Sequence, residues 1–217
     1  MGKITVIGIG PGNLDQMTPK ARAAIDAADV VAGFTTYIKF IKSIIGDKEV
    51  IGTGMMQEVD RCRLAVKAAA DGRNVVMVSS GAAGISAVNG AAAVLGAPLM
   101  HDFAVISLSD RLTPWGLIKK RAMLAAQGDF VIALYNPKSK SRVKNIEEIH
   151  DILMQYKSPE TPVGIVRSAS REDERKVITN LRDFTKEEID MFSIVIIGNS
   201  KTFVKDGVMV TPRGYKI

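Results

Sequence analysis

The sequence predicts an α/β protein with mostly parallel strands, on two observations. Short apolar runs alternate with longer amphipathic stretches along all 217 residues, as in strands joined by crossover helices. Thr18–Pro19 and Thr113–Pro114 each pair a capping hydroxyl with a proline suited to the first helical position. The segment 107–115, SLSDRLTPW, is the expected hinge between two halves of the chain, 1–109 and 110–217.

The individual elements follow from this alternation. The expected strands are short apolar runs, at 3–10, 29–34, 75–80, 103–109, 130–137, 161–168 and 193–200. The expected helices lie between them, at 20–28, 58–70, 86–95, 114–127 and 143–156. The second of these helices is expected to carry apolar residues towards a core, namely Val59, Leu64, Val66 and Ala69. Thr185 and Glu188 predict a capping box for a further short helix.

Composition narrows the class of protein. A hydrophobic fraction of 47% with 24% charged residues is ordinary for a soluble protein. No apolar run approaches the roughly 18 residues that span a membrane, so no membrane partner is expected. Met1 leads within a few residues into an apolar strand, so we expect no signal peptide and a cytoplasmic location. Cys62 is the only cysteine, which excludes an internal disulfide and a cysteine-rich metal site.

The net charge of +6 is concentrated in one segment. Between residues 111 and 144 the only acidic residue is Asp129. The same segment contains eight basic residues, namely Arg111, Lys119, Lys120, Arg121, Lys138, Lys140, Arg142 and Lys144. Such a run is commonly a solvated face. It also suits an anionic partner, either nucleic acid or a small molecule with many carboxylates or phosphates.

A glycine-rich turn, GIGPG at 8–12, follows the first strand and precedes the first helix. Its spacing is not G-x-G-x-x-G, and the second strand ends at Gly33–Phe34 without an acid for a ribose hydroxyl. Pro11 also removes a backbone donor that a pyrophosphate would use. These features disfavour NAD and leave two interpretations, a tight structural turn or a site for a nucleotide-like ligand without a pyrophosphate.

Residues for acid–base or metal chemistry are sparse. The chain has two histidines, His101 and His150, and contains no H-E-x-x-H, G-x-S-x-G or Walker motif. A hydrolytic or metal centre is therefore not expected. A reaction that depends mainly on positioning an activated donor against a nucleophile fits better, and methyl transfer from a sulfonium is one such reaction.

Several motifs are spread over nearly the whole chain: VIGIGPGNLDQMTPKA, GTGMMQEVDRCRLA, HDFAVISLSDRLTPW, FVIALYNPKSKSR, GIVRSASREDE, IVIIGNS and TPRGY. Together they resemble the tetrapyrrole (corrin/porphyrin) methylases of cobalamin (vitamin B12) synthesis. ISLSDRLTPW, ALYNPKSKSR and TPRGY are similar to the branch that methylates C17 of a precorrin-3 type macrocycle, whereas GxGPG is common to the superfamily.

This resemblance implies two α/β domains, S-adenosylmethionine in the cleft between them, and a homodimer. It implies C17 methylation of precorrin-3B or cobalt-precorrin-3 with ring contraction. Matched by motif, the cofactor-binding positions are Gly10, Pro11, Gly81, Ser86, Ala87, Tyr135, Asn136 and Ala169. The carboxylates of the substrate suit the basic segment, where binding is expected of Arg111, Lys119, Lys120, Lys138 and Arg142. No catalytic residue and no metal ligand is assigned.

The chain departs from the family after Gly81. Family members continue from VSSG into a Gly-Asp-Pro-Gly type loop, a helix and a strand before GIS, whereas here Ala82–Ala83 lead almost directly into GISAVNG. A parallel crossover needs about a dozen residues or more. A segment lost from the chain and a naturally short variant both stay open. In either case the aspartate expected beside the methionyl group is not in this sequence. If the loss is real in the protein, S-adenosylmethionine binding should be weak.

Two other functions stay open. The same fold includes methylases that act on RNA, and a positive net charge suits RNA. However, only 6% of residues are aromatic, and the basic segment contains few of them, among them Trp115 and Tyr135, which disfavours nucleic acid. A non-catalytic tetrapyrrole binder is the other alternative, because it would explain the missing loop.

Overall fold

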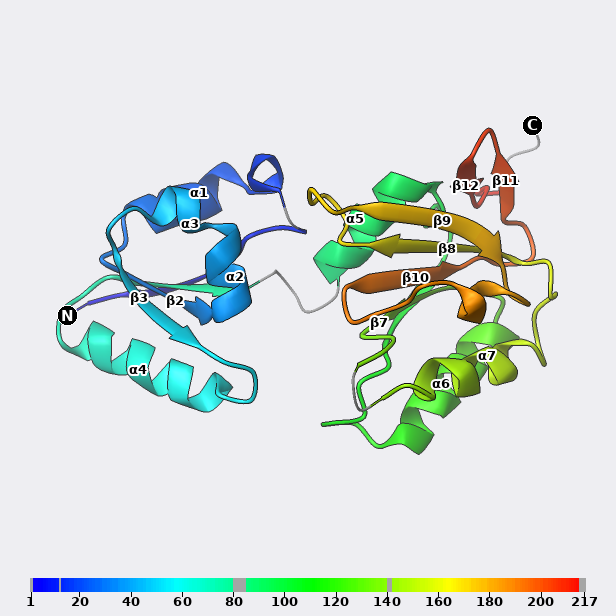
Figure 1. The fold of residues 1–217 in the computed structure, drawn as a ribbon, viewed down its shortest axis with the longest axis horizontal. Coiled ribbons are helices and arrows are strands. Elements are labelled where there is room, and N and C mark those ends of the chain that lie inside the picture. The colour runs from blue at the N-terminus through cyan, green and yellow to red at the C-terminus, as the bar shows by residue number, and fades with distance from the viewer. Residues whose placement is uncertain (1, 12, 80–84, 140–141, 215–217) are drawn as a thin grey trace. The chain divides into compact units, whose positions relative to one another are not determined.

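A computed structural model describes all residues except 1, 12, 80–84, 140–141 and 215–217 (Figure 1). The chain forms two compact units, Met1–Ser86 and Ala87–Ile217. This division falls earlier than the predicted one after residue 109, because the segment 103–107 is a strand in the sheet of the second unit.

The first unit is built on a four-stranded sheet, in which every pair of neighbours is parallel. Its strands lie in the order β1 (Ile4–Gly8), β4 (Val75–Ser79), β2 (Val30–Phe34) and β3 (Glu49–Thr53). Its helices are α1 (Pro19–Asp26), α2 (Thr35–Phe40), α3 (Lys42–Ile45) and α4 (Glu58–Ala70), with a 3-10 turn at Leu14–Gln16. The predicted start of α1 is confirmed, since Thr18 Oγ1 accepts a hydrogen bond from the Ala21 amide at 3.2 Å.

The helices cover opposite faces of this sheet (Figure 1). Helices α1–α3 pack Ile25 and Ile41 against Val31 and Val76, and α4 packs small residues against the other face, namely Ala65, Ala68 and Ala69. The expectation that Val59, Leu64 and Val66 face a core is wrong. Val59 and Val66 are 64% and 58% exposed and Leu64 is also exposed, because each lies about 100° or more around the helix from Ala65.

The second unit is built on a five-stranded mixed sheet. The order is β6 (Phe103–Ser107), β7 (Val131–Tyr135), β10 (Ser193–Ile197), β8 (Pro162–Arg167) and β9 (Arg175–Asn180). β6 and β7 are parallel, whereas β10 runs antiparallel to both β7 and β8, and β8 and β9 are antiparallel. The chain is thus an α/β protein, with the expected parallel pairing throughout the first sheet and in one pair of the second.

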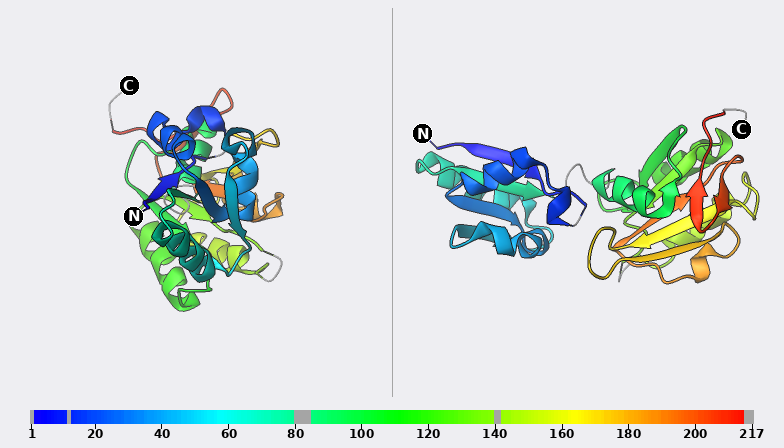
Figure 2. Two further views of the ribbon diagram at one scale, coloured as in Figure 1. Left: turned by 90° about the vertical axis from the view of Figure 1, so that its left-hand side faces the viewer. Right: turned by 90° about the horizontal axis from the view of Figure 1, so that it is seen from above.

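Helices cover both faces of the second sheet (Figures 1 and 2). On one face lies α5 (Ile85–Leu95), and on the other lie α6 (Trp115–Gln127) and α7 (Asn145–Leu153). Successive residues of β7 alternate between these two cores, as a strand requires. A small sheet of β11 (Phe203–Lys205), β12 (Val208–Val210) and β5 (Gly96–Ala97) completes the unit.

Two predicted helix starts are wrong. Helix α6 begins at Trp115 with Pro114 in the capping position, and no side chain caps it, so Thr113 has no capping role. The turn Phe184–Lys186 is a 3-10 helix whose N-cap is Asp183, one residue before the phenylalanine. Glu188 instead lies 3.3 Å from Arg175 Nη1 in an ion pair, which removes the second half of the expected capping box.

Candidate functional site

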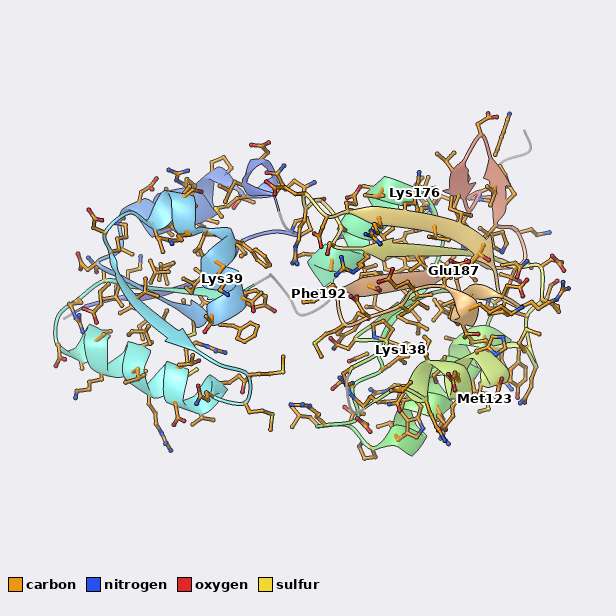
Figure 3. All side chains as sticks on the ribbon, viewed as in Figure 1. Lys39, Met123, Lys138, Lys176, Glu187 and Phe192 are labelled. Atoms are coloured by element: carbon orange, nitrogen blue, oxygen red, sulfur yellow. The ribbon has the colours of Figure 1, made fainter. Side chains whose placement is uncertain are left out.

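Three strands of the second unit end at the same side of its sheet. Because β10 is antiparallel to both of its neighbours, β6, β7 and β8 run in one direction. In register, Ser107 lies opposite Tyr135, and Arg167 lies opposite Ser193 at the start of β10. Figure 3 shows Phe192 and Lys138 at this end of the sheet. The carboxyl ends of strands are the usual place for ligand sites in α/β sheets.

The turn after β7 is fixed by short polar contacts. Asn136 has a left-handed φ of 53°, a conformation that asparagine tolerates better than most residues. Its Nδ2 donates to Ser107 Oγ at 3.1 Å, and the Leu108 amide donates to the Tyr135 carbonyl at 3.0 Å. These contacts hold the Tyr135 backbone at the end of the sheet. The Asn136 side chain is therefore engaged in supporting the turn.

A second turn, Ser168–Ala169–Ser170, follows β8. Ser168 and Ser170 have φ values of 51° and 63°, so both lie in the left-handed region. Ala169 between them is 7% exposed and belongs to the apolar cluster against which Ala87 and Tyr135 pack. The structure thus brings three of the predicted cofactor-binding residues into one cluster. Ser86, half-buried, is the neighbour of Ala87 in α5.

The other predicted cofactor positions belong to the first unit. Gly10 has a φ of +81°, and a Cβ there would lie 3.0 Å from the Gln16 carbonyl oxygen, so the turn requires glycine. The Ile9 amide donates to Ser79 O at 2.8 Å, which fixes the turn and Pro11 near the carboxyl end of β4. Gly81 lies outside the described residues.

The predicted substrate-binding cations differ in their surroundings. Arg111 and Lys120 are exposed and Lys138 is half-buried. Lys119 Nζ lies 3.2 Å from Glu148 Oε2, which also accepts from Trp115 Nε1 at 2.9 Å. Hydrogen bonds from Trp115 and Lys119 hold the pKa of Glu148 below its usual value.

Arg142 is turned into the protein and is only 9% exposed. Its Nη1 donates to the Leu108 carbonyl at 3.2 Å and its Nε donates to Ser139 Oγ at 3.1 Å. Asn145 Nδ2 donates to the same carbonyl at 3.2 Å. Arg142 therefore ties the segment after β6 to the segment after β7, and its role in substrate binding stays a prediction.

Sequence reasoning missed an ionic cluster at this end of the sheet. Arg167 contacts Asp173 and Asp190, at 2.7 and 2.9 Å. Arg167 and Asp173 lie within the motif GIVRSASREDE, where a charged residue directly ends a buried strand, and that signal was available. Nothing in the sequence around Asp190 indicates this contact. It depends on the pairing of β10 with β8, which brings Asp190 beside Arg167.

Two other features of the described residues bear on function. Among them, no group of three or more histidine, cysteine, aspartate or glutamate side chains could hold a metal ion. None of their helices is long and apolar enough to cross a membrane.

Comparison with known proteins identifies the family. The profile for Tetrapyrrole (Corrin/Porphyrin) Methylases matches residues 3–83 and 82–185. A probable cobalt-factor III C(17)-methyltransferase of Salmonella typhimurium is 45% identical, and the match covers 99% of this chain and 100% of that protein. A cobalt-factor III methyltransferase of Priestia megaterium is also 45% identical over 99% of this chain, which spans 45% of that longer protein.

Solved structures agree with this assignment. The crystal structure of the methyltransferase CobJ is 34% identical, with a TM-score of 0.91 over 98% of this chain and 100% of that one. The uroporphyrin-III C-methyltransferase of Thermus thermophilus, solved with S-adenosylhomocysteine, is 19% identical. It covers 91% of this chain and 97% of its own with a TM-score of 0.69, and so shows the shared fold alone.

The comparisons also bear on the departure after Gly81. The alignment with the Salmonella protein runs over 240 positions, more than the 217 residues of this chain, so that relative carries residues that this chain lacks. The two stretches of the family match meet at residues 82–83. That the missing residues form a loop, helix and strand stays a prediction. The match on both sides of this break spans most of the chain, which belongs to the tetrapyrrole (corrin/porphyrin) methylase family.

Proposed function

We propose that this protein transfers a methyl group from S-adenosylmethionine to C17 of a precorrin-3 type tetrapyrrole, with ring contraction. The observation that carries the proposal is the 45% identity to the Salmonella protein over that protein's full length. Because both relatives with this identity are named for cobalt-factor III, the cobalt-containing macrocycle is the preferred substrate. The resemblance further supports a cytoplasmic homodimer.

The chemistry of the described residues fits such a cofactor. Ala87 and Ala169 offer small apolar surfaces and Tyr135 offers an aromatic one, a combination suited to a flat heteroaromatic base. Gly10 allows the tight left-handed turn that also contains Pro11, at the position matched to the cofactor by motif. S-Adenosylmethionine would supply a methyl group on a sulfonium sulfur. The residues of the chain would hold the adenosyl end and exclude water from it.

Alignment is the expected source of the rate. The carboxylates described at the end of the second sheet, Asp173 and Asp190, are engaged with Arg167, so they are poor candidates for a general base. Holding two reactants in line can lower a barrier by roughly 7–11 kcal/mol without proton transfer. The exposed cations Arg111 and Lys120 would orient the carboxylates of the macrocycle.

One observation favours a second candidate. The break of the family match at residues 82–83 falls where a loop beside the methionyl group is expected. A chain without that loop could bind tetrapyrrole without transferring a methyl group. The names of the relatives give no comparable support for an RNA substrate.

Two measurements on the purified chain test these functions. Calorimetry with S-adenosylhomocysteine reports on the cofactor site, and mass spectrometry of cobalt-factor III incubated with methyl-deuterated cofactor reports on transfer. Binding of the nucleoside together with one labelled methyl group on the macrocycle would support the methyltransferase. Macrocycle binding without nucleoside binding or transfer would support the non-catalytic binder instead.

A further inference from the structure

We propose that Arg167 is a positioning residue, which holds the turn Ser168–Ala169–Ser170 in the conformation that receives the adenosyl end of the cofactor. This inference rests on the proposed function, because it assigns the turn to the cofactor site. Arg167 is the last residue of β8, so its backbone is fixed by pairing with Ser193 on β10 and Arg175 on β9.

The guanidinium of Arg167 is held by three partners. Its Nε donates to Asp190 Oδ2 at 2.9 Å, and its Nη1 donates to Asp173 Oδ2 at 2.7 Å. The planar group also lies over the ring of Phe192, 5.8 Å from the ring centroid. A planar guanidinium can donate to two carboxylates in a fixed geometry while its face stacks on an aromatic ring, whereas an ammonium has no planar face to stack. The side chain therefore has one well-defined position.

The same partners hold the turn. The Ser168 amide donates to the Phe192 carbonyl at 3.1 Å, and Ser168 Oγ donates to Asp173 Oδ2 at 3.0 Å. Arg167 thus contacts both the carboxylate that binds the Ser168 side chain and the residue that binds its backbone. Beyond Ser168, the Ser170 amide donates to the Glu174 carboxylate. The turn is fixed along its length by partners outside it.

The turn needs this support because its backbone is strained. Left-handed φ values are unfavourable for residues with a Cβ, and here two serines adopt them on either side of Ala169. Strained backbone persists only where its surroundings fix it, and it is concentrated at ligand sites. The strain turns Ala169 into the cluster with Ala87 and Tyr135. Arg167 contacts the turn through its carboxylate and aromatic partners, so it acts through the turn.

The carboxylates remain charged near neutral pH, so the support is permanent. The hydrogen bond from Ser168, aided by that from Arg167, lowers the pKa of Asp173. Burial would raise the pKa of Asp190, but hydrogen bonds from Arg167, the Phe192 amide and Ser193 outweigh it and lower the pKa.

The test compares R167Q with R175Q in the full chain, using S-adenosylhomocysteine as the probe. Arg175 is the matched control, because it lies opposite Arg167 on the next strand and forms an exposed ion pair with Glu188. R167Q is expected to raise the Kd of the nucleoside about tenfold, the scale of one charged hydrogen bond. R167K should recover part of this loss, and R175Q should bind like the wild type. Turnover at saturating cofactor should change less than the KM for the cofactor.

Two outcomes overturn the inference in distinguishable ways. Wild-type affinity in a folded R167Q, with a normal wild-type Kd, would overturn the role of Arg167 and leave the proposed function intact. Failure of the wild-type chain to bind the nucleoside at all would overturn the proposed function and this inference with it. If R167Q fails to fold, D173A gives the same test, because Asp173 is exposed and alanine removes the acceptor for both Ser168 Oγ and Arg167.

Discussion

Helices pack on both faces of the second sheet. Helices also lie on both faces of the first sheet, but among the described residues none covers the edge strand β1 at Val6. In β1 the side chain of Val6 is 70% exposed, on the same face as Ile4, which packs on the α4 side. Beside β1 and α1 lies a hollow of about 670 Å³, lined in part by Lys3, Val6 and Ala24. By contrast, every residue of β10 is buried.

The right-handedness of crossovers between parallel strands predicts which face of β1 an additional helix would cover. Right-handed crossovers to β2 and β3 place α1–α3 on one face, and the return from β3 to β4 places α4 on the other. A further crossover from β4 past β1 would continue in the direction of the return. Its helix would therefore lie beside α4, over Val6. The relatives carry additional residues, and the family match breaks directly after β4. We expect those residues to cover this face.

The largest expected effect is on the free energy of unfolding, in a comparison of a buried residue of the second unit with an exposed residue of the first. Leu134 is buried between the second sheet and α6–α7, so L134A should cost about 2–5 kcal/mol of unfolding free energy in that unit. V66A in α4 removes an exposed side chain and should change stability by less than about 0.5 kcal/mol. Trp115, the only tryptophan, lies in α6, so its fluorescence in denaturant measures the loss in L134A, and circular dichroism of the first unit's helices measures the loss in V66A. Equal losses in both variants would contradict the comparison.

Restoring the missing residues should stabilise the first unit. Replacing Ala82–Ala83 with the corresponding segment of the Salmonella relative is expected to bury Val6 and its surroundings, contributing about 2–3 kcal/mol. Circular dichroism melting should show a higher first transition, while Trp115 fluorescence stays unchanged. The control is a glycine–serine insertion of equal length. If that insertion stabilises the unit as much, the segment does not pack on β1.

A smaller effect is expected at the cofactor site of the second unit. Tyr135 packs against the apolar cluster that contains Ala169, so Y135A should weaken S-adenosylhomocysteine binding by roughly 1–3 kcal/mol through lost contact. Y135F keeps the ring and should bind and turn over nearly normally. Calorimetry and steady-state kinetics distinguish the two. A Y135F variant that binds normally but loses turnover a thousandfold (roughly 4 kcal/mol) would show that a proton-handling group had been missed.

The smallest expected effect is on the pH dependence of stability. The folded-state pKa of Asp190 lies below its ordinary value, so its stabilising contribution is complete above the unfolded pKa of about 4. That contribution is lost as the pH falls through the lower folded-state pKa. D190N should therefore reduce the fluorescence melting temperature by roughly 1–3 °C at pH 7 and progressively less below pH 4. A difference that grows as the pH falls would contradict this account.

The sequence predicted features that depend on neighbouring residues. Thr18 and Pro19 determine a helix start locally, and the apolar runs of β1, β2 and β4 are strands of a parallel sheet, although β1 is only partly buried. The placement of β10 between β7 and β8 was not predictable, because it depends on pairing between distant segments. The same pairing brings Asp190 to Arg167, so that contact was missed with it.

Helix α4 shows a different failure. Its valines and leucine dominate any hydrophobic pattern, yet the alanines Ala65, Ala68 and Ala69 make the contact with the sheet. Side-chain size, and not hydrophobicity alone, selected the buried face. In the candidate site, the sequence supplied Ala87, Tyr135 and Ala169 through motif resemblance, and their presence in one cluster depends on the fold.

Amide hydrogen exchange on the intact chain tests the difference between the units most directly. Among the residues that the structure describes, β10 is paired on both sides and fully buried, whereas β1 is paired on one side only and carries the exposed Val6. Exchange resolved by peptide mass spectrometry should be slower for residues 193–197 than for residues 4–8 by about 100-fold or more. Equal protection of the two strands, or slower exchange in β1, would contradict the conclusion that the first unit is the incompletely covered one.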